Sequence, residues 1–201
     1  MKKYLTLFLI ALVISGCATQ INQRNAQKYW NAATIARDQG NWQLARSNWS
    51  KTIVNGNLGG VDQRNMSIAY YEYGRASGIL CIWEEAENGL TKSLEIDRSN
   101  SGPVHLPLIE LARLNYDQRK FAQAAKFFRE AKPIVDSFNA ETQDPLGYAE
   151  FLEEFSESIE KSTGGQETSQ YRKRANQLRA TFPDGTKRTE RTPYGTECNA
   201  S

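Results

Sequence analysis

The chain has 201 residues, of which 39% are apolar and 24% are charged, with 25 basic and 23 acidic side chains. This apolar content is enough for the core of one compact domain or a short repeat array. The near-neutral balance, without a run of six basic residues, gives no electrostatic reason to expect nucleic acid as a partner.

The N-terminal segment is predicted to be an export signal that ends at a lipid attachment site. Two lysines precede an uncharged apolar run at 4–14, which is too short to span a bilayer as a permanent helix. The Ser-Gly-Cys sequence that ends at Cys17 resembles the lipobox of bacterial lipoproteins. This resemblance implies removal of residues 1–16 and a diacylglyceryl group on Cys17. The alternative is an uncleaved or ordinarily secreted segment.

The residue after Cys17 bears on which membrane holds the protein. An aspartate there would resemble the inner-membrane retention signal of enterobacteria, whereas this chain has Ala18. We therefore expect a lipid anchor in the outer membrane of a Gram-negative bacterium, with the protein facing the periplasm. Residues 17–25 would be the lipidated cysteine and a short tether, at most about 27 Å long if extended, so the body should lie close to the membrane.

One pattern occurs three times between residues 26 and 138, as a short amphipathic segment, a turn and a second segment. Small residues stand where the two segments would cross and where the second would cross the next unit: Ala33, Gly74 and Ala112, then Ala45, Ala86 and Ala124. Large residues stand at fixed distances from the second alanine: Trp42, Trp83 and Phe121 before it, and Trp49, Leu90 and Phe128 after it. The pattern resembles tetratricopeptide repeats (TPRs), which implies an all-α fold of antiparallel helix hairpins stacked as a short superhelical array.

The copies depart from the TPR pattern in their length. The alanines of the second segments are 41 and 38 positions apart, whereas the usual TPR period is about 34 residues. We expect the extra residues to form loops at 55–62 and 99–103, where glycine, asparagine, serine and proline gather. We assign Trp42, Trp49 and Trp83 to the core, because large aromatics at regular helical positions are usually packing residues.

Two cysteines remain once Cys17 carries lipid, and the expected compartment is oxidising. A disulfide between Cys81 and Cys198 would close a loop of 117 residues and stabilise the fold by about 4–5 kcal/mol. The alternative is a buried thiol at Cys81 and a free thiol at Cys198. The spacing alone does not decide between them.

A capping hairpin is expected over residues 144–182. Asp144-Pro145 is typical of a helix start, and glycines at 164 and 165 should turn the chain into a last helix at 167–181. The first helix has an apolar face and a glutamate face, which we expect to be solvated: Tyr148, Phe151, Leu152, Phe155 and Ile159 against Glu150, Glu153, Glu154, Glu157 and Glu160. The polar tail at 183–201 should be mobile or packed on the outside, fixed by Cys198.

In TPR proteins, the first helices of the hairpins line an inner groove that binds partners. The resemblance places the following residues in such a groove: Trp30, Asn31, Arg37, Tyr71, Arg75, Ile109, Arg113 and Tyr116. Aromatic and arginine side chains suit a peptide ligand. The alternative is a solvated face on which Arg75 and Arg113 pair with Glu72 and Glu110, one turn earlier.

No motif in the sequence predicts catalysis, a cofactor or a metal site. The single histidine, His105, stands near Pro103 at an expected helix start, without a nucleophile in any motif context. One histidine and two distant cysteines do not supply a zinc site. We therefore expect a protein that is not an enzyme.

The sequence favours a lipid-anchored periplasmic TPR adaptor that binds an envelope protein or peptide segment in its concave groove. Similar lipoproteins serve pilus assembly, the scaffolding of cell-wall hydrolases and outer-membrane assembly. The alternative is a structural lipoprotein that binds peptidoglycan directly, with a glycan strand stacked on Trp30, Tyr71 and Tyr116. A third possibility is contact of the basic last helix with anionic lipid, although its arginines can equally pair with the preceding glutamates.

Overall fold

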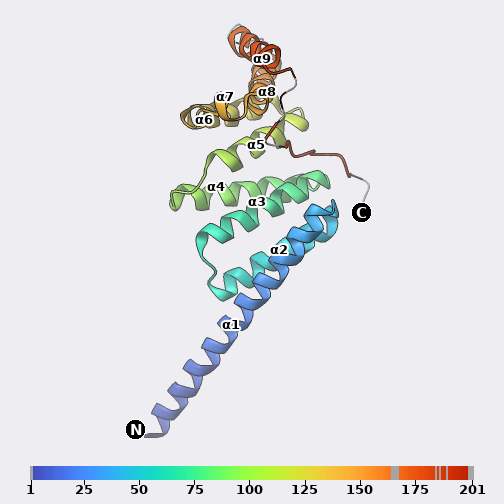
Figure 1. Cartoon of the computed structure of the whole chain (residues 1–201). Helices are drawn as coiled ribbons and strands as arrows, with labels where there is room; N and C mark the ends of the chain where they lie inside the picture. Colours follow the sequence, from blue (N-terminus) through green and yellow to red (C-terminus); the bar gives the residue numbers. More distant parts are fainter. Residues whose placement is uncertain (1, 164–167, 184, 186, 189, 199–201) are drawn as a thin grey trace.

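Stacked helix hairpins make up the part of the chain that the computed structural model describes, namely residues 2–163, 168–183, 185, 187–188 and 190–198 (Figure 1). In this part no strand occurs, which confirms the all-α prediction. The helices are α1 (Lys2–Asp38), α2 (Trp42–Gly59), α3 (Gln63–Ile79), α4 (Trp83–Ser99), α5 (His105–Asp117), α6 (Phe121–Ser137), α7 (Ala140–Gln143), α8 (Pro145–Thr163) and α9 (Ser169–Thr181). The pairs α1/α2, α3/α4, α5/α6 and α8/α9 form four successive hairpins.

Small residues let the two helices of a hairpin approach closely, as the repeat pattern predicts. The alanines at the predicted crossing points are almost fully buried: Ala33, Ala45, Ala86, Ala112 and Ala124. At Gly74 a Cβ atom would lie 2.8 Å from the Leu90 side chain and 2.9 Å from the Ala86 carbonyl oxygen. The α3/α4 crossing therefore has no room for a methyl group.

Replacing Gly74 by alanine is expected to lower the free energy of unfolding by about 1–3 kcal/mol, because the added methyl overpacks the crossing. Urea denaturation of the two proteins measures the change. Gly56→Ala in α2 is the control, since a Cβ there meets the flexible Met66 side chain. Equal losses in the two variants would contradict the close approach at Gly74.

The tryptophans expected in the core differ in their burial. Trp49 is fully buried and contacts Trp30 edge to face, with ring centroids 4.9 Å apart. Trp42 and Trp83 are only half-buried, so the core prediction is wrong for them in part. Each is the first residue of its helix, where fewer neighbouring turns are available to cover a large ring.

The first helix is longer than the sequence predicts. Residues 18–25, treated above as a tether, are helical and continue into the first hairpin. Gln23 donates a hydrogen bond from Nε2 to the Gly59 carbonyl oxygen, at 2.8 Å. Eight helical residues span about 12 Å. The side chain of Cys17 lies outside the described residues. Among those that are described, no helix has both the length and the apolar character needed to cross a bilayer.

The predicted loop at 55–62 is mostly helical, which corrects the sequence prediction. Helix α2 continues to Gly59 and ends at Gly60, whose φ of +64° is the left-handed conformation that glycine favours. The glycines at 56 and 59 pack within the helix against Met66 and Gln23. The other predicted loop falls largely between the end of α4 and the start of α5.

The capping hairpin begins as predicted. Asp144 Oδ1 accepts a hydrogen bond from the Gly147 amide, at 3.1 Å, and Pro145 is the first helical residue. All five apolar residues predicted for the inner side of α8 are buried. The predicted turn at glycines 164 and 165 lies outside the described residues. The short helix α7, before α8, has no counterpart in the sequence prediction.

The chain does not leave the array after α9. The described residues 187, 188 and 190–198, which we call the C-terminal arm, run back along α8, α5 and α3 and end beside Cys81 (Figure 1). These helices are the first members of their hairpins, and we call the face that they form with α1 the inner face. The expectation that the tail is mobile or packed on the outside is therefore wrong for these residues, whereas its expected fixation by Cys198 is present.

Candidate functional site

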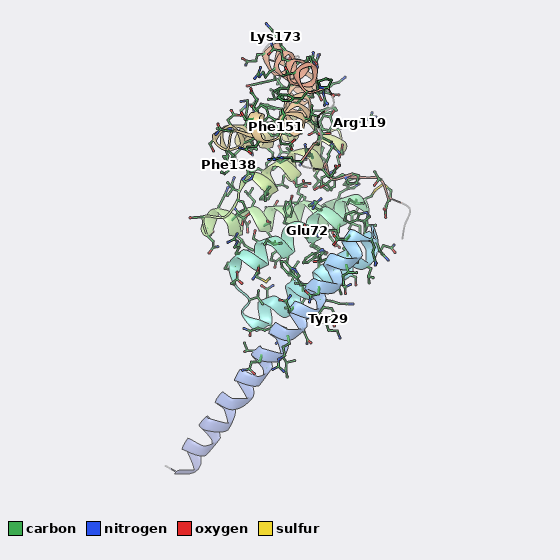
Figure 2. The ribbon with its side chains drawn as sticks, viewed as in Figure 1. Tyr29, Glu72, Arg119, Phe138, Phe151 and Lys173 are labelled. Carbon is green, nitrogen blue, oxygen red and sulfur yellow. A yellow bond between two sulfur atoms is a disulfide. The ribbon has the colours of Figure 1, made fainter. Side chains whose placement is uncertain are left out.

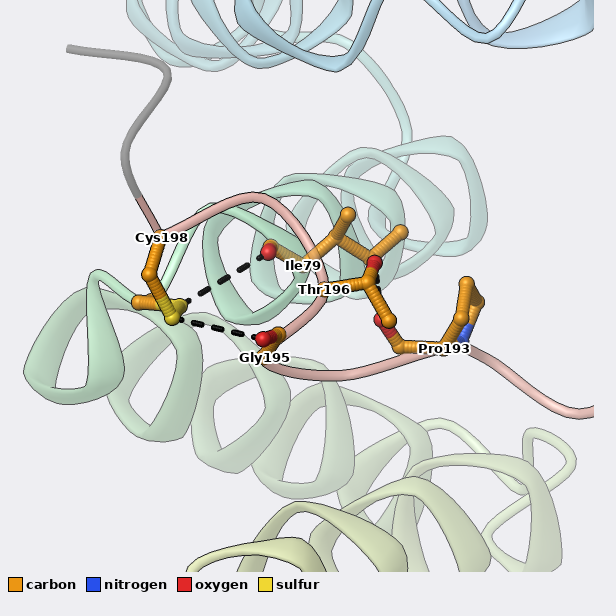
Figure 3. Close-up of a disulfide and its surroundings, with 6 residues drawn as sticks. Ile79, Pro193, Gly195, Thr196 and Cys198 are labelled. Atoms are coloured by element: carbon orange, nitrogen blue, oxygen red, sulfur yellow. Dashed lines mark hydrogen bonds between the residues drawn. A yellow bond between two sulfur atoms is a disulfide. The ribbon is translucent and has the colours of Figure 1, made fainter.

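A disulfide fixes the end of the arm. Cys81 and Cys198 are bonded, with their Cα atoms 4.9 Å apart (Figure 3). Before it, the Gly195 amide donates to the Gly78 carbonyl at 3.1 Å, and the Glu197 amide donates to the Ile79 carbonyl at 3.0 Å. The last turn of a helix has carbonyl groups without intrahelical partners. The arm therefore binds α3 through its main chain as well as through sulfur.

Tyr194 is the main apolar anchor of the arm. Its ring is buried against Gly78, where a Cβ atom would lie 2.4 Å from the nearest ring carbon. Its hydroxyl donates a hydrogen bond to Glu110 Oε2, at 2.6 Å. Burial and the Glu110 carboxylate raise the pKa of Tyr194 well above its ordinary value. The phenol therefore stays a neutral donor, and the glycine in α3 makes room for it.

Thr192 and Arg191 hold the arm through polar contacts. Thr192 is fully buried and its Oγ1 accepts a hydrogen bond from Arg75 Nε, at 2.8 Å. Arg191 pairs with Asp117, at 2.6 Å, and with Glu154, so it bridges α5 and α8. Because an arginine fork presents several donors at once, one side chain can satisfy both carboxylates.

Beneath the arm lies a buried ion pair that the sequence does not predict. Arg113 Nε donates to Glu154 Oε2 at 2.8 Å, and both residues are only 6% exposed. Burial opposes the charge of Arg113, but the carboxylates of Glu154, Glu110 and Glu150 together outweigh it and raise the pKa of Arg113. The expected partner of Arg113, Glu110, binds Tyr194 instead. Part of the glutamate face of α8 is thus buried, which corrects the solvated face expected above.

The residues predicted for the groove fall into two groups. Tyr71, Arg75, Ile109, Arg113 and Tyr116 lie along the arm or beside the cavity described below. The remaining three lie in the first hairpin: Trp30 packs on Trp49, Asn31 is exposed, and Arg37 pairs with Asp38 and Glu72. Of the expected local pairs, the one between Arg75 and Glu72 is present, at 3.3 Å.

The aromatic residues of the glycan alternative are each engaged by protein neighbours. The Tyr71 ring lies under the Arg75 guanidinium, at 5.5 Å. The Tyr116 hydroxyl donates to Glu157 at 2.7 Å, and Arg191 lies 5.9 Å from its ring. Trp30 stands edge to face on Trp49. No observation therefore favours a continuous stacking surface made of these three rings.

An open cavity of about 530 Å³ lies beside the first residues of the arm, between α5, α7 and α8. Its boundary toward the arm is formed by Tyr71, Arg75 and Glu190, and its walls are mainly apolar: Leu106, Ile109, Val135, Phe138, Tyr148 and Phe151. Leu106 and Phe138 are 42% and 56% exposed at the rim. Figure 2 shows Phe138 at the edge of the array and Phe151 between helices. This part of the inner face is unfilled and partly apolar.

His105 stands beside the same cavity. Its ring lies 4.8 Å from that of Phe138, and burial lowers its pKa. Within the described ranges, its Nδ1 atom is buried without a hydrogen-bond partner. The same part of the chain contains no group of three His, Cys, Asp or Glu residues arranged to hold a metal ion.

Neither a protein-family model nor a curated protein matches this chain. The solved structures that resemble it are helical repeat proteins. BtubC (BKLC) from P. vanneervenii aligns with a TM-score of 0.70 at 16% identity, covering 83% of this chain and 67% of that one. A putative kinesin light chain from Podosopora anserina, with nearly identical TPR-like repeats, aligns with a TM-score of 0.61 at 14% identity, covering 80% and 77%. Such identities establish the fold alone, and the chain accordingly folds as a TPR-like helical repeat protein.

Proposed function

We propose that this protein is an adaptor of the bacterial envelope that binds non-helical segments of partner proteins on its inner face. The observation that carries the proposal is the docked arm. A segment without helix, which turns at residues 194–196, lies on α3, α5 and α8 and is held by main-chain and side-chain contacts. A face that holds one such segment in this way has the hydrogen-bonding groups to hold another. The adjoining cavity supplies unfilled apolar surface for it.

The lipobox resemblance supports an anchored position for this adaptor. In the proposal, a diacylglyceryl group on Cys17 holds the protein at the outer membrane, facing the periplasm. Two or more acyl chains make such an anchor long-lived. Because the chain after residue 17 is already helical, the first repeat would begin about 12 Å from the lipid. Partners would then belong to envelope machinery such as pilus assembly, cell-wall hydrolase complexes or outer-membrane assembly.

Crosslinking in intact envelopes tests the proposal. We expect partner crosslinks around the cavity, and at least a tenfold loss of them in Leu106→Asp/Phe138→Asp, because the carboxylates would be desolvated on binding. Ile35→Asp/Val54→Asp is the matched control, since both apolar side chains are exposed outside the cavity. Cys17→Ser should release the protein into the soluble fraction.

Equal crosslinking in the two double variants would contradict binding in the groove. Membrane retention of the Cys17→Ser protein would contradict the lipid anchor. Mass spectrometry of the crosslinked peptides identifies the partner segment. The two double variants change exposed side chains only, so circular dichroism can check that both keep the wild-type fold.

A further inference from the structure

We propose that the surface under the arm is a binding site for a partner peptide that has the arm's own chemistry. The Cys81–Cys198 disulfide holds the arm on this site and so keeps the partner peptide out. This inference rests on the proposed function, because it names the ligand and the control of the same inner face. The ligand class is a non-helical segment with an arginine, a hydroxyl side chain and a tyrosine within four residues, followed by glycine, at which the arm turns.

Each element of that ligand corresponds to a feature of the surface. The arginine meets two carboxylates, from Asp117 and Glu154. The hydroxyl side chain fits a fully enclosed position where Arg75 Nε donates to it. These contacts recognise a cationic residue next to a small polar one, and an acidic residue in the first position would face like charge.

The aromatic position is the most selective one. The space over Gly78 admits a flat ring, and Glu110 Oε2 accepts from its hydroxyl at 2.6 Å. A phenylalanine would leave this buried carboxylate without that donor, which costs more than the loss of the bond alone. The next residue, Gly195, has a φ of +75° and lies against Trp83, with a would-be Cβ 3.1 Å from the ring. Glycine is therefore the residue that fits after the tyrosine.

The arm occupies this surface because it is tethered to it. A segment joined to its own site has an effective concentration of order millimolar, so a free peptide competes poorly. The disulfide removes most of the remaining freedom, since it closes a loop of 117 residues at the end of the arm. A partner segment would enter only after the arm has left.

The disulfide is placed where a reductant can reach it. Cys198 is exposed and Cys81 is half-buried at the end of α3. A dithiol of a thiol–disulfide oxidoreductase would attack Cys198, forming a mixed disulfide and releasing the Cys81 thiolate, which takes up a proton. The second thiolate of the oxidoreductase then attacks the mixed disulfide and displaces Cys198 as a thiolate, which also takes up a proton. The protein gains two electrons and two protons, and the reductant ends as a disulfide.

A labelled peptide with the sequence of residues 187–197 is the probe. We expect the opened variant Tyr194→Ala/Cys198→Ser to bind it at least tenfold more tightly than the oxidised wild type, as measured by fluorescence anisotropy. Reduced wild type should lie between the two, because its own arm still competes. The same peptide with alanine in place of its tyrosine should bind at least tenfold more weakly.

Adding Gly78→Ala to the opened variant locates the site. Its methyl group would overlap the peptide's tyrosine ring, so binding should fall at least tenfold, whereas Gly56→Ala, also within a helix, should leave binding unchanged. Cys198→Ser alone serves as the second opened variant if the double variant does not fold. Equal binding to oxidised and opened proteins, or binding that survives Gly78→Ala, would overturn the inference. Envelope crosslinks that persist when the peptide does not bind would leave the adaptor function standing.

Discussion

Loss of the disulfide is expected to lower the free energy of unfolding by about 4–5 kcal/mol, because the unfolded chain then regains the freedom of a 117-residue loop. Guanidinium denaturation of the Cys198→Ser variant and of the oxidised wild type measures the difference. Reductant should lower the midpoint of the wild type and leave that of the variant unchanged. A loss below about 1 kcal/mol would mean that the bridge constrains the unfolded chain much less than its loop length indicates.

Replacing Glu154 by leucine is expected to lower the free energy of unfolding by about 3–5 kcal/mol, because Arg113 would remain buried without this carboxylate. Urea denaturation measures the effect. Glu153→Leu is the matched control on the same helix. Glu153 pairs with Arg179 at the surface, where exposed ion pairs contribute about 0–1 kcal/mol.

The double variant Arg113→Met/Glu154→Leu distinguishes the cost of leaving the Arg113 charge buried and unpaired from the net contribution of the ion pair to stability. Replacing both partners by apolar side chains is expected to restore most of the stability lost in Glu154→Leu, since no buried charge is then left unpaired. If the double variant were less stable than Glu154→Leu, the cost would lie in lost packing and not in desolvation of Arg113.

Much of the fold could be predicted because its signals are local and repeated. The small residues at the crossings, such as Gly74 and Ala112, and the apolar spacing of α8 each report on a helix and its nearest neighbour. The prediction of a loop at 55–62 is wrong for a related reason. Glycine favours turns, but at position 59 it lies inside the helix, where the backbone of α1 at Gln23 comes too close for a side chain.

The path of the arm could not be predicted in the same way. Its residues have no helical periodicity, and their partners are distant in the chain, with Tyr194 and Glu110 separated by 84 residues. The possible Cys81–Cys198 pair indicated where the arm could end but not its path. A further signal was Gly78, a glycine inside a helix that no repeat position explains. The pairing of Arg113 with α8 was missed because Glu110 is closer in sequence, whereas the stacked hairpins bring Glu154 closer in space.

The bond between Cys81 and Cys198 also decides how the molecule would carry a mechanical load. A pull applied between residue 17 and the end of the arm passes along α1, α2 and α3, through the two sulfur atoms, and out of the chain. Helices α4 to α9 lie within the closed covalent ring and bear none of that tension. The first three helices would therefore yield to force while the part of the inner face that lies within the ring keeps its shape.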